Sequence, residues 1–269
     1  MTTPRRLQTE GITVNVRVEG TGKPLLFLGG SSFDLSLRAP VFDSDLPPHF
    51  EVAAADPRGL GLTDAPDGDW TMQDYARDAL HLIDALGWDR VDVLGESFGA
   101  MTALHLGALA PQRINRMALC VGAAGGVGGQ SYPIHELKQI TDVRLRAKCA
   151  LGIVDTRFEA LLVEDPAAAE AKIEARVASD ATFMAHSKNA EGHPRLLQAR
   201  AAHDAWSELP NIATPTHVFA GQFDQQAPLE RVENIVAAMP DATLHVVEGG
   251  HNICFVSPTP VAKIIENWT

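Results

Sequence analysis

A serine between two glycines is the segment of this sequence best suited to chemistry. Residues 95–99 read Gly-Glu-Ser-Phe-Gly, after an apolar run over residues 91–94 and before a helical stretch over residues 100–109. A buried strand, a sharp turn and a helix in this order are the context of a nucleophile elbow, which lifts the serine hydroxyl above the sheet. The five-residue pattern alone also occurs in Gly/Ser-rich turns without chemistry. In this context it predicts that Ser97 is a nucleophile.

A serine hydroxyl needs a base to remove its proton and an acid to orient that base. Two residues of these types follow later in the chain, Asp224 after a strand over 216–220 and His251 after a strand over 243–247. Catalytic groups in open α/β sheets lie beyond the carboxyl ends of the strands. Taken singly, the aspartate reads as a turn residue and the histidine as a surface or packed side chain. Together with the elbow they predict a triad of Ser97, Asp224 and His251.

Three other carboxylates are rivals for the acid. Glu248 is too close to His251 in sequence to hold the ring from the opposite side. Asp204 and Glu96 are weaker rivals, and Glu96 is expected to shape the surroundings of the elbow.

An acyl-transfer intermediate also needs donors for its oxyanion. One expected donor is the backbone N–H of Phe98, directly after the nucleophile. The second is expected from the glycine-containing loop after residue 28, where we assign the N–H of Ser31 with Gly30 as the neighbouring alternative. The alternative interpretation of this loop is a plain glycine turn.

The elements around these residues alternate between strand and helix. Strands are predicted over residues 12–18, 25–28, 50–55, 91–94, 117–121, 216–220 and 243–247. Helices are predicted over 100–109, 229–239 and 260–268, and another is opened at Thr71 by a capping box with Asp74. This alternation predicts a doubly wound, mostly parallel α/β sheet.

The alternation stops after the strand over residues 117–121. Residues 122–130 are rich in glycine and alanine, lack the spacing of a phosphate cradle and are interpreted as a hinge. The following residues are helical in composition. We therefore expect a core formed by residues 1–124 and 207–269, and a helical lid over residues 125–206.

The chain resembles the α/β-hydrolase superfamily of serine hydrolases, in particular esterases and enol-lactonases. The resemblance rests on residues 25–30, the elbow, Gly250-His251, residues 221–228 and the loop over 56–64, which is similar to a D-x-R-G-x-G-x-S-D loop. It implies a cofactor-free enzyme with the α/β-hydrolase fold and a helical lid. Gly29-Gly30 stands where the family often has His-Gly. Haloalkane dehalogenases and epoxide hydrolases carry aspartate at the elbow, where this chain has Ser97.

The expected activity is hydrolysis of a carboxylic ester or lactone through an acyl-enzyme. The same triad leaves open a hydrolase of carbon–carbon bonds in ring-cleavage products, a thioesterase or an acyltransferase, because chemistry on a shared fold is set by the site. A binding protein or receptor with slow turnover is a further alternative.

The substrate pocket is expected to be partly apolar. Aromatic and aliphatic side chains flank the catalytic positions at Phe33, Phe223 and Ile253. An arginine facing the pocket would favour an acidic substrate. An amphipathic helix over residues 194–206 offers side chains for the pocket, namely Arg195, Gln198, Arg200, His203 and Trp206. The alternative interpretation is a solvated helix face.

Composition narrows the remaining possibilities. The 269 residues carry a formal net charge of −12, which disfavours nucleic acid and anionic membranes as partners. No apolar stretch approaches the ~20 residues of a membrane span, no secretory signal is visible, and three scattered cysteines suit a reducing compartment. Ten histidines form no metal-ligand motif. We expect a cytoplasmic enzyme for a small-molecule substrate, without metal or cofactor, and a homodimer stays open.

Overall fold

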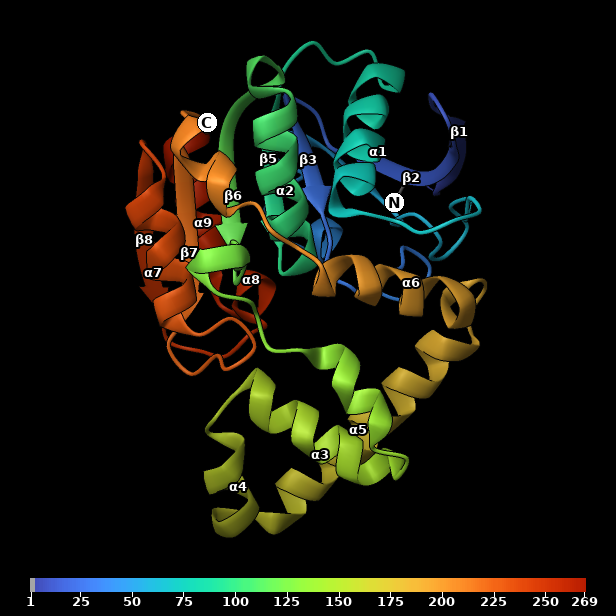
Figure 1. The fold of residues 1–269 in the computed structure, drawn as a ribbon, viewed down its shortest axis with the longest axis vertical. Helices are drawn as coiled ribbons and strands as arrows, with labels where there is room; N and C mark the ends of the chain where they lie inside the picture. Colours follow the sequence, from blue (N-terminus) through green and yellow to red (C-terminus); the bar gives the residue numbers. More distant parts are fainter. Residues whose placement is uncertain (1–2) are drawn as a thin grey trace.

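The computed structural model describes residues 3–269 and contains an eight-stranded sheet with helices on both faces (Figure 1). The first strands along the sheet, β1 (Arg5–Gln8) and β2 (Thr13–Glu19), pair antiparallel with each other, and β2 pairs antiparallel with β4 (Phe50–Ala55). The remaining strands pair in parallel. They are, in spatial order after β4, β3 (Lys23–Leu28), β5 (Val91–Glu96), β6 (Ile114–Cys120), β7 (Thr216–Gly221) and β8 (Ala242–Val247). The predicted α/β fold class is confirmed.

The central strands are apolar at consecutive positions because both faces of the sheet are covered. Leu26 of β3 packs in the cluster beneath three helices, α1 (Met72–Ala85), α2 (Phe98–Leu109) and α7 (Leu229–Ala238). Its neighbours Leu25 and Phe27 point to the opposite face and pack against α8 (Ile253–Val256) and α9 (Pro258–Trp268). These two cores hold the strand ends in a fixed arrangement.

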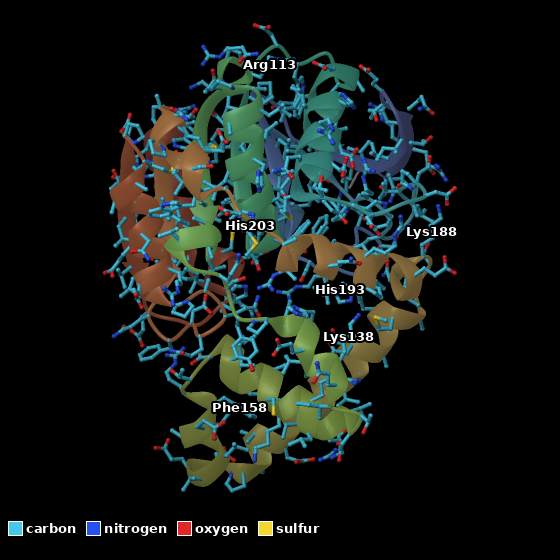
Figure 2. All side chains as sticks on the ribbon, in the orientation of Figure 1. Arg113, Lys138, Phe158, Lys188, His193 and His203 are labelled. Atoms are coloured by element: carbon cyan, nitrogen blue, oxygen red, sulfur yellow. The ribbon has the colours of Figure 1, made fainter. Side chains whose placement is uncertain are left out.

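A helical insertion lies between β6 and β7. Its helices are α3 (Val143–Val154), α4 (Phe158–Glu164), α5 (Pro166–Ala185) and α6 (Asn189–Ala201). Helices α3 to α5 lie together beyond one end of the sheet, and α6 lies between them and the strands (Figure 1). Ala147, Phe158, Ala169 and Ile173 form a small separate core in the insertion, and Phe158 is labelled there in Figure 2.

Several element boundaries differ from the prediction. The helix predicted over residues 194–206 is wrong at both ends, because α6 begins at Asn189, contains Pro194 and stops at Ala201. A proline is favoured in the first turn of a helix, but here it lies one turn further in. Trp206 therefore starts a separate 3₁₀ helix that ends at Asn211. The capping box of Thr71 and Asp74 is confirmed. Strand β1 is not part of the prediction, since Arg5–Gln8 carries little apolar periodicity.

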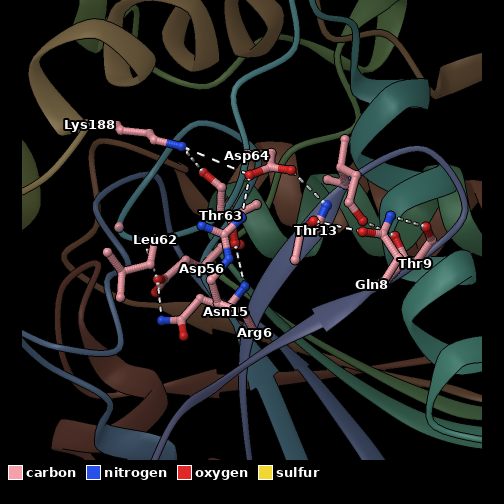
Figure 3. Close-up of polar contacts among 12 residues, drawn as sticks. Arg6, Gln8, Thr9, Thr13, Asn15, Asp56, Leu62, Thr63, Asp64 and Lys188 are labelled. Atoms are coloured by element: carbon pink, nitrogen blue, oxygen red, sulfur yellow. Dashed lines mark hydrogen bonds and ion pairs between the residues drawn. The ribbon is translucent and has the colours of Figure 1, made fainter.

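The loop over residues 56–64 is held by a network of hydrogen bonds (Figure 3). Buried Asp56 accepts from Asn15 Nδ2 at 2.7 Å and from the N–H of Leu62 at 3.0 Å. Its other oxygen accepts from the N–H of Leu35 at 2.7 Å, and burial raises the pKa of this carboxyl. Asp56 thereby connects this loop to the one that follows β3, which carries the predicted oxyanion donors.

Among the residues that the structure describes, no helix combines the length and apolarity needed to cross a membrane.

Candidate active site

Ser97 lies at a sharp turn between β5 and α2. Its backbone has φ 55° and ψ −111°, a conformation rarely adopted by residues with a side chain. The turn is tight on both sides. A Cβ at Gly95 would lie 2.6 Å from the carbonyl oxygen of Gly99, and a Cβ at Gly99 would overlap the carbonyl of Leu28. Glycine is required at both positions, which gives the small residues of the motif a steric reason.

A continuous chain of hydrogen bonds connects three side chains at this turn. Ser97 Oγ lies 2.7 Å from His251 Nε2, and His251 Nδ1 lies 2.7 Å from Asp224 Oδ2. All three residues are buried. Because an ionised aspartate only accepts hydrogen bonds, the proton of the neutral ring belongs on Nδ1, which leaves Nε2 free to accept from the serine.

Backbone donors hold the aspartate in place. Asp224 Oδ1 accepts from the N–H of Gln226 at 2.7 Å and of Ala227 at 3.0 Å, while Oδ2 faces the histidine. Each oxygen therefore has its own partners. The carboxylate cannot rotate without losing backbone hydrogen bonds, so its orientation toward His251 is fixed.

The end of helix α3 is bonded to the loops that carry Asp224 and His251. The N–H of His251 donates to Val154 O at 2.7 Å, and the N–H of Gln225 donates to Ile153 O at 3.0 Å. Thr156 donates its N–H to Phe223 O at 3.0 Å. The helical insertion thus contributes directly to the position of both side chains. The sequence contained no signal for these bonds, because each of them uses backbone atoms.

Gln226 is a site residue that the sequence analysis missed. Its side-chain nitrogen lies 2.6 Å from His251 Nε2 and 3.4 Å from Ser97 Oγ. The backbone carbonyl of Gln226 accepts from the N–H of Tyr132 in the insertion at 2.8 Å. Gln226 follows Asp224 by two positions, and that spacing was the signal available in the sequence.

The predicted oxyanion residues come from two segments of the chain. Phe98 is the first residue of α2, where backbone N–H groups have no partner within the helix. Gly30 approaches from the loop after β3, and an ideal Cβ on it would lie 3.8 Å from Ser97 Cβ. Ser31 follows Gly30 in that loop, and the loop folds back through a hydrogen bond from Phe33 N–H to Gly30 O.

Within the described residues, none of the rival carboxylates is hydrogen-bonded to His251. The Glu248 side chain is 80% exposed, and its carboxylate lies 3.5 Å from Arg157. Asp204 is exposed and accepts from the N–H of Trp206 at 3.0 Å. Glu96 is the rival nearest to the histidine. Burial raises the pKa of the Glu96 carboxyl, although the positive charges of His251 and Arg38 act to lower it.

Two of the predicted apolar pocket residues, Phe33 and Ile253, are part of the hydrophobic core, whereas Phe223 is half-buried. Phe33 is buried and meets Phe27 edge to face at 5.4 Å. Ile253 is buried at the start of α8. The Phe223 ring is covered by the Arg157 guanidinium at 4.4 Å.

The other predicted pocket residues make contacts within the protein. Arg195 donates to Pro66 O at 2.6 Å and lies 3.6 Å above the Trp70 ring. His203 lies near the end of α2 (Figure 2), where its Nδ1 is 3.0 Å from His105 Nε2 and its Nε2 is 2.8 Å from Ala123 O. Burial lowers the pKa of each of these two histidines to about 4. Trp206 packs against Gly128.

Arg200 on α6 is a buried cation. It is 3% exposed and donates to Ser131 Oγ at 2.6 Å and to Tyr132 O at 3.0 Å. Within residues 3–269 its Nε has no hydrogen-bond partner and no carboxylate forms an ion pair with it. Burial lowers the pKa of Arg200 to about 10, which leaves it charged at neutral pH.

Further nitrogen-bearing side chains lie around the same helix. Both ring nitrogens of His193, one full heptad before Arg200 on α6, are buried without a partner in the described chain. Burial lowers the pKa of His193 to about 4. Lys138, on the 3₁₀ helix Ile134–Gln139, and His193, on α6, are both labelled in Figure 2. Burial also lowers the pKa of Lys138.

No group of three or more His, Cys, Asp or Glu side chains is placed to hold a metal ion in the described residues.

Comparison with known proteins agrees with the fold and defines the family. Residues 24–258 match the alpha/beta hydrolase fold family. The chain therefore belongs to the α/β-hydrolase family, and its general class is that of a hydrolase.

Two curated relatives cover most of the chain. One is a poly(3-hydroxyalkanoate) depolymerase of Ectopseudomonas oleovorans, 26% identical over 90% of this chain and 82% of the relative. Another is a putative carbamate hydrolase RutD of Pseudomonas savastanoi pv. phaseolicola, 27% identical over 93% and 95%. Among solved structures, the enol-lactonase from Burkholderia xenovorans is 25% identical, with a TM-score of 0.76 over 98% of both chains.

Proposed function

We propose that this protein is a serine hydrolase that cleaves a carboxylic ester or lactone through an acyl-enzyme. The observation that carries this proposal is the chain of two 2.7 Å hydrogen bonds from Asp224 through His251 to Ser97. The enol-lactonase and depolymerase names of two relatives support the acyl chemistry. Another relative is named a putative carbamate hydrolase. A carbamate also has a carbonyl carbon, which the same three side chains could attack.

The proposed reaction has two halves, in which the acyl-enzyme is first formed and then hydrolysed. Ser97 Oγ attacks the carbonyl carbon while His251 Nε2 takes its proton, and Asp224 stabilises the imidazolium that forms. The N–H groups of Phe98 and Ser31, with Gly30 as the neighbouring alternative, hold the oxyanion. His251 then returns the proton to the leaving oxygen. An ester releases its alcohol at this point, whereas the hydroxyl formed from a lactone stays attached to the acyl group. In the second half, water attacks the acyl-enzyme while His251 takes its proton, and His251 then returns that proton to Ser97 Oγ as the acid is released.

Turnover of an activated ester tests this proposal. With p-nitrophenyl esters we expect a burst of nitrophenolate equal to the enzyme concentration, followed by a slower steady rate, because an acyl-enzyme accumulates. A panel of esters, lactones, thioesters, carbamates and a ring-cleavage diketone then ranks the substrate classes by kcat/KM. A best substrate outside the esters and lactones would contradict the proposed bond. Covalent labelling of the protein by a small fluorophosphonate, without turnover of any of these substrate classes, would favour a binding protein with slow turnover.

Arg200 supports a preference for an acidic acyl group. A buried charge with only neutral partners is costly unless a counter-ion joins it. Arg200 bonds to Tyr132 O, and the N–H of Tyr132 bonds to Gln226 beside the nucleophile. A carboxylate on the substrate would complete the coordination of the guanidinium through its free Nε.

Removal of this charge should therefore change specificity. We expect Arg200→Gln to lower kcat/KM for a monoaryl glutarate by about 30-fold or more, and to change kcat/KM for the neutral aryl valerate far less. Arg195→Gln is the matched control, because Arg195 lies on the same helix but contacts the loop at Pro66. Equal losses on both esters in Arg200→Gln would assign that arginine a structural role alone.

A further inference from the structure

The Gln226 side chain occupies the edge of the imidazole at which the proposed proton transfers occur. Its side-chain nitrogen is 2.6 Å from His251 Nε2 and 3.4 Å from Ser97 Oγ. The residue is 8% exposed. Its backbone is held from two sides, by Asp224 Oδ1 and by the N–H of Tyr132. The carboxamide is therefore carried on a fixed backbone and meets both reacting atoms.

His251 Nε2 can form hydrogen bonds in only one way in each protonation state, and this constrains the group that faces it. With its proton on Nδ1, the neutral ring has one lone pair in its plane, at Nε2. The Ser97 hydroxyl and the Gln226 amide both lie within donating distance of that lone pair. After His251 takes the serine proton, Nε2 becomes a donor, and an amide N–H facing it would be repelled.

A carboxamide can satisfy both states because it carries a donor and an acceptor on one planar group. Rotation about its last side-chain bond exchanges the NH₂ group for Oε1 at the same place. No other residue type of this size and neutral charge offers both. A methionine there would match neither state, and a glutamate would favour the protonated ring.

We propose that Gln226 is a further catalytic residue, which donates to neutral His251 in the resting enzyme and accepts from the imidazolium during the reaction. This inference rests on the proposed function. The proton passes from Ser97 Oγ to His251 Nε2 as the bond from Oγ to the carbonyl carbon forms. The carboxamide turns so that Oε1 accepts from Nε2–H. It turns back when the proton leaves for the departing oxygen.

Other charged groups also face His251 and set the background of its titration. Asp224 lies on Nδ1. Glu96 at the end of β5 interacts with the ring and with Arg38. From the insertion, Asp155 packs against Gly250 next to the ring and is paired with Arg157. The test leaves all of these unchanged and alters only the group at Nε2.

Two variants of similar size and one control test the inference. We expect Gln226→Met to lower kcat by about 10- to 100-fold with KM within about threefold, because the imidazolium loses its acceptor. We expect Gln226→Glu to raise the pKa on the acidic limb of kcat/KM by about one unit or more, because the added carboxylate keeps a proton on the ring to higher pH. Gln225→Met should behave as wild type, since Gln225 is exposed and, among the described residues, its hydrogen bond runs from its backbone N–H to Ile153 O.

Labelling of wild-type Ser97 by a small fluorophosphonate is measured first, together with the melting temperature of each variant. Absence of labelling overturns the proposed function and this inference with it. If labelling occurs, a kcat within twofold of wild type in folded Gln226→Met overturns the inference alone. An unmoved acidic limb in Gln226→Glu does the same, because it would show that the side chain at position 226 does not contact His251 Nε2 in the working enzyme. If Gln226→Met does not fold, the pH dependence of kcat/KM in Gln226→Glu decides whether the inference stands.

Discussion

Ser97→Ala is expected to lower kcat by roughly three to six orders of magnitude on the best ester or lactone. The proposed mechanism loses its covalent step, and only the oxyanion donors and substrate binding remain to assist water. The fold should be unaffected. Alanine also carries a Cβ, so it meets the same strain at φ 55° as the serine does. The measurement is single-turnover and steady-state kinetics on the purified variant, with circular dichroism and melting temperature as checks of folding.

Ser32→Ala is the matched control for this variant. Ser32 is exposed in the loop after β3. Removal of its hydroxyl should leave kcat within about twofold of the wild-type value, as for surface changes in general. A Ser97→Ala enzyme that keeps more than a tenth of the wild-type rate would contradict the assignment of Ser97 as nucleophile.

Asp224→Asn is expected to lower kcat by about four orders of magnitude. The reason lies in the two sides of this carboxyl group. The N–H groups of Gln226 and Ala227 require an acceptor on one side, so the asparagine oxygen remains there. Its NH₂ group then faces His251 Nδ1 and donates to it. The ring proton moves to Nε2, which can no longer accept the proton of Ser97.

Glu248→Gln is the control for the choice of acid. The Glu248 side chain is exposed and has Arg157 as its ion-pair partner, so we expect a change in kcat of less than about threefold. Similar losses in Asp224→Asn and Glu248→Gln would contradict the assignment of Asp224.

The sequence predicted the parts of the site that depend on strand ends. Parallel strands bring their carboxyl ends to one edge of the sheet. For this reason the residues just after β5, β7 and β8 could be grouped from their order in the chain, and the structure brings Ser97, Asp224 and His251 within hydrogen-bond distance. The capping box of α1 was predictable for a similar reason, because both of its residues lie within one turn.

The sequence could not predict contacts that join distant backbone atoms. Val154 O accepts from His251 N–H across nearly one hundred residues, and every residue type at position 154 would carry the same backbone carbonyl. The length of α6 was misjudged because Pro194 is tolerated inside the helix. Gln226 was missed because its role depends on where its backbone is held, and this follows from Asp224 and Tyr132 rather than from a motif.

The pocket was the least predictable part. Arg195 and Arg200 lie on the same helix and look equivalent in sequence. The structure separates them, since Arg195 reaches the carbonyls of the loop before Trp70, whereas Arg200 is buried beside Ser131 and Tyr132. A difference of five residues in a helix is about 140° around its axis, so the two side chains leave on different faces.

Covalent labelling tests the central claim most directly. The intact enzyme is treated with a small fluorophosphonate, digested, and analysed by mass spectrometry to locate the adduct. The account predicts one adduct per chain on Ser97, a labelling rate that falls as His251 is protonated, and no adduct in Ser97→Ala. An adduct on another residue, or undiminished labelling of Ser97→Ala, would contradict it.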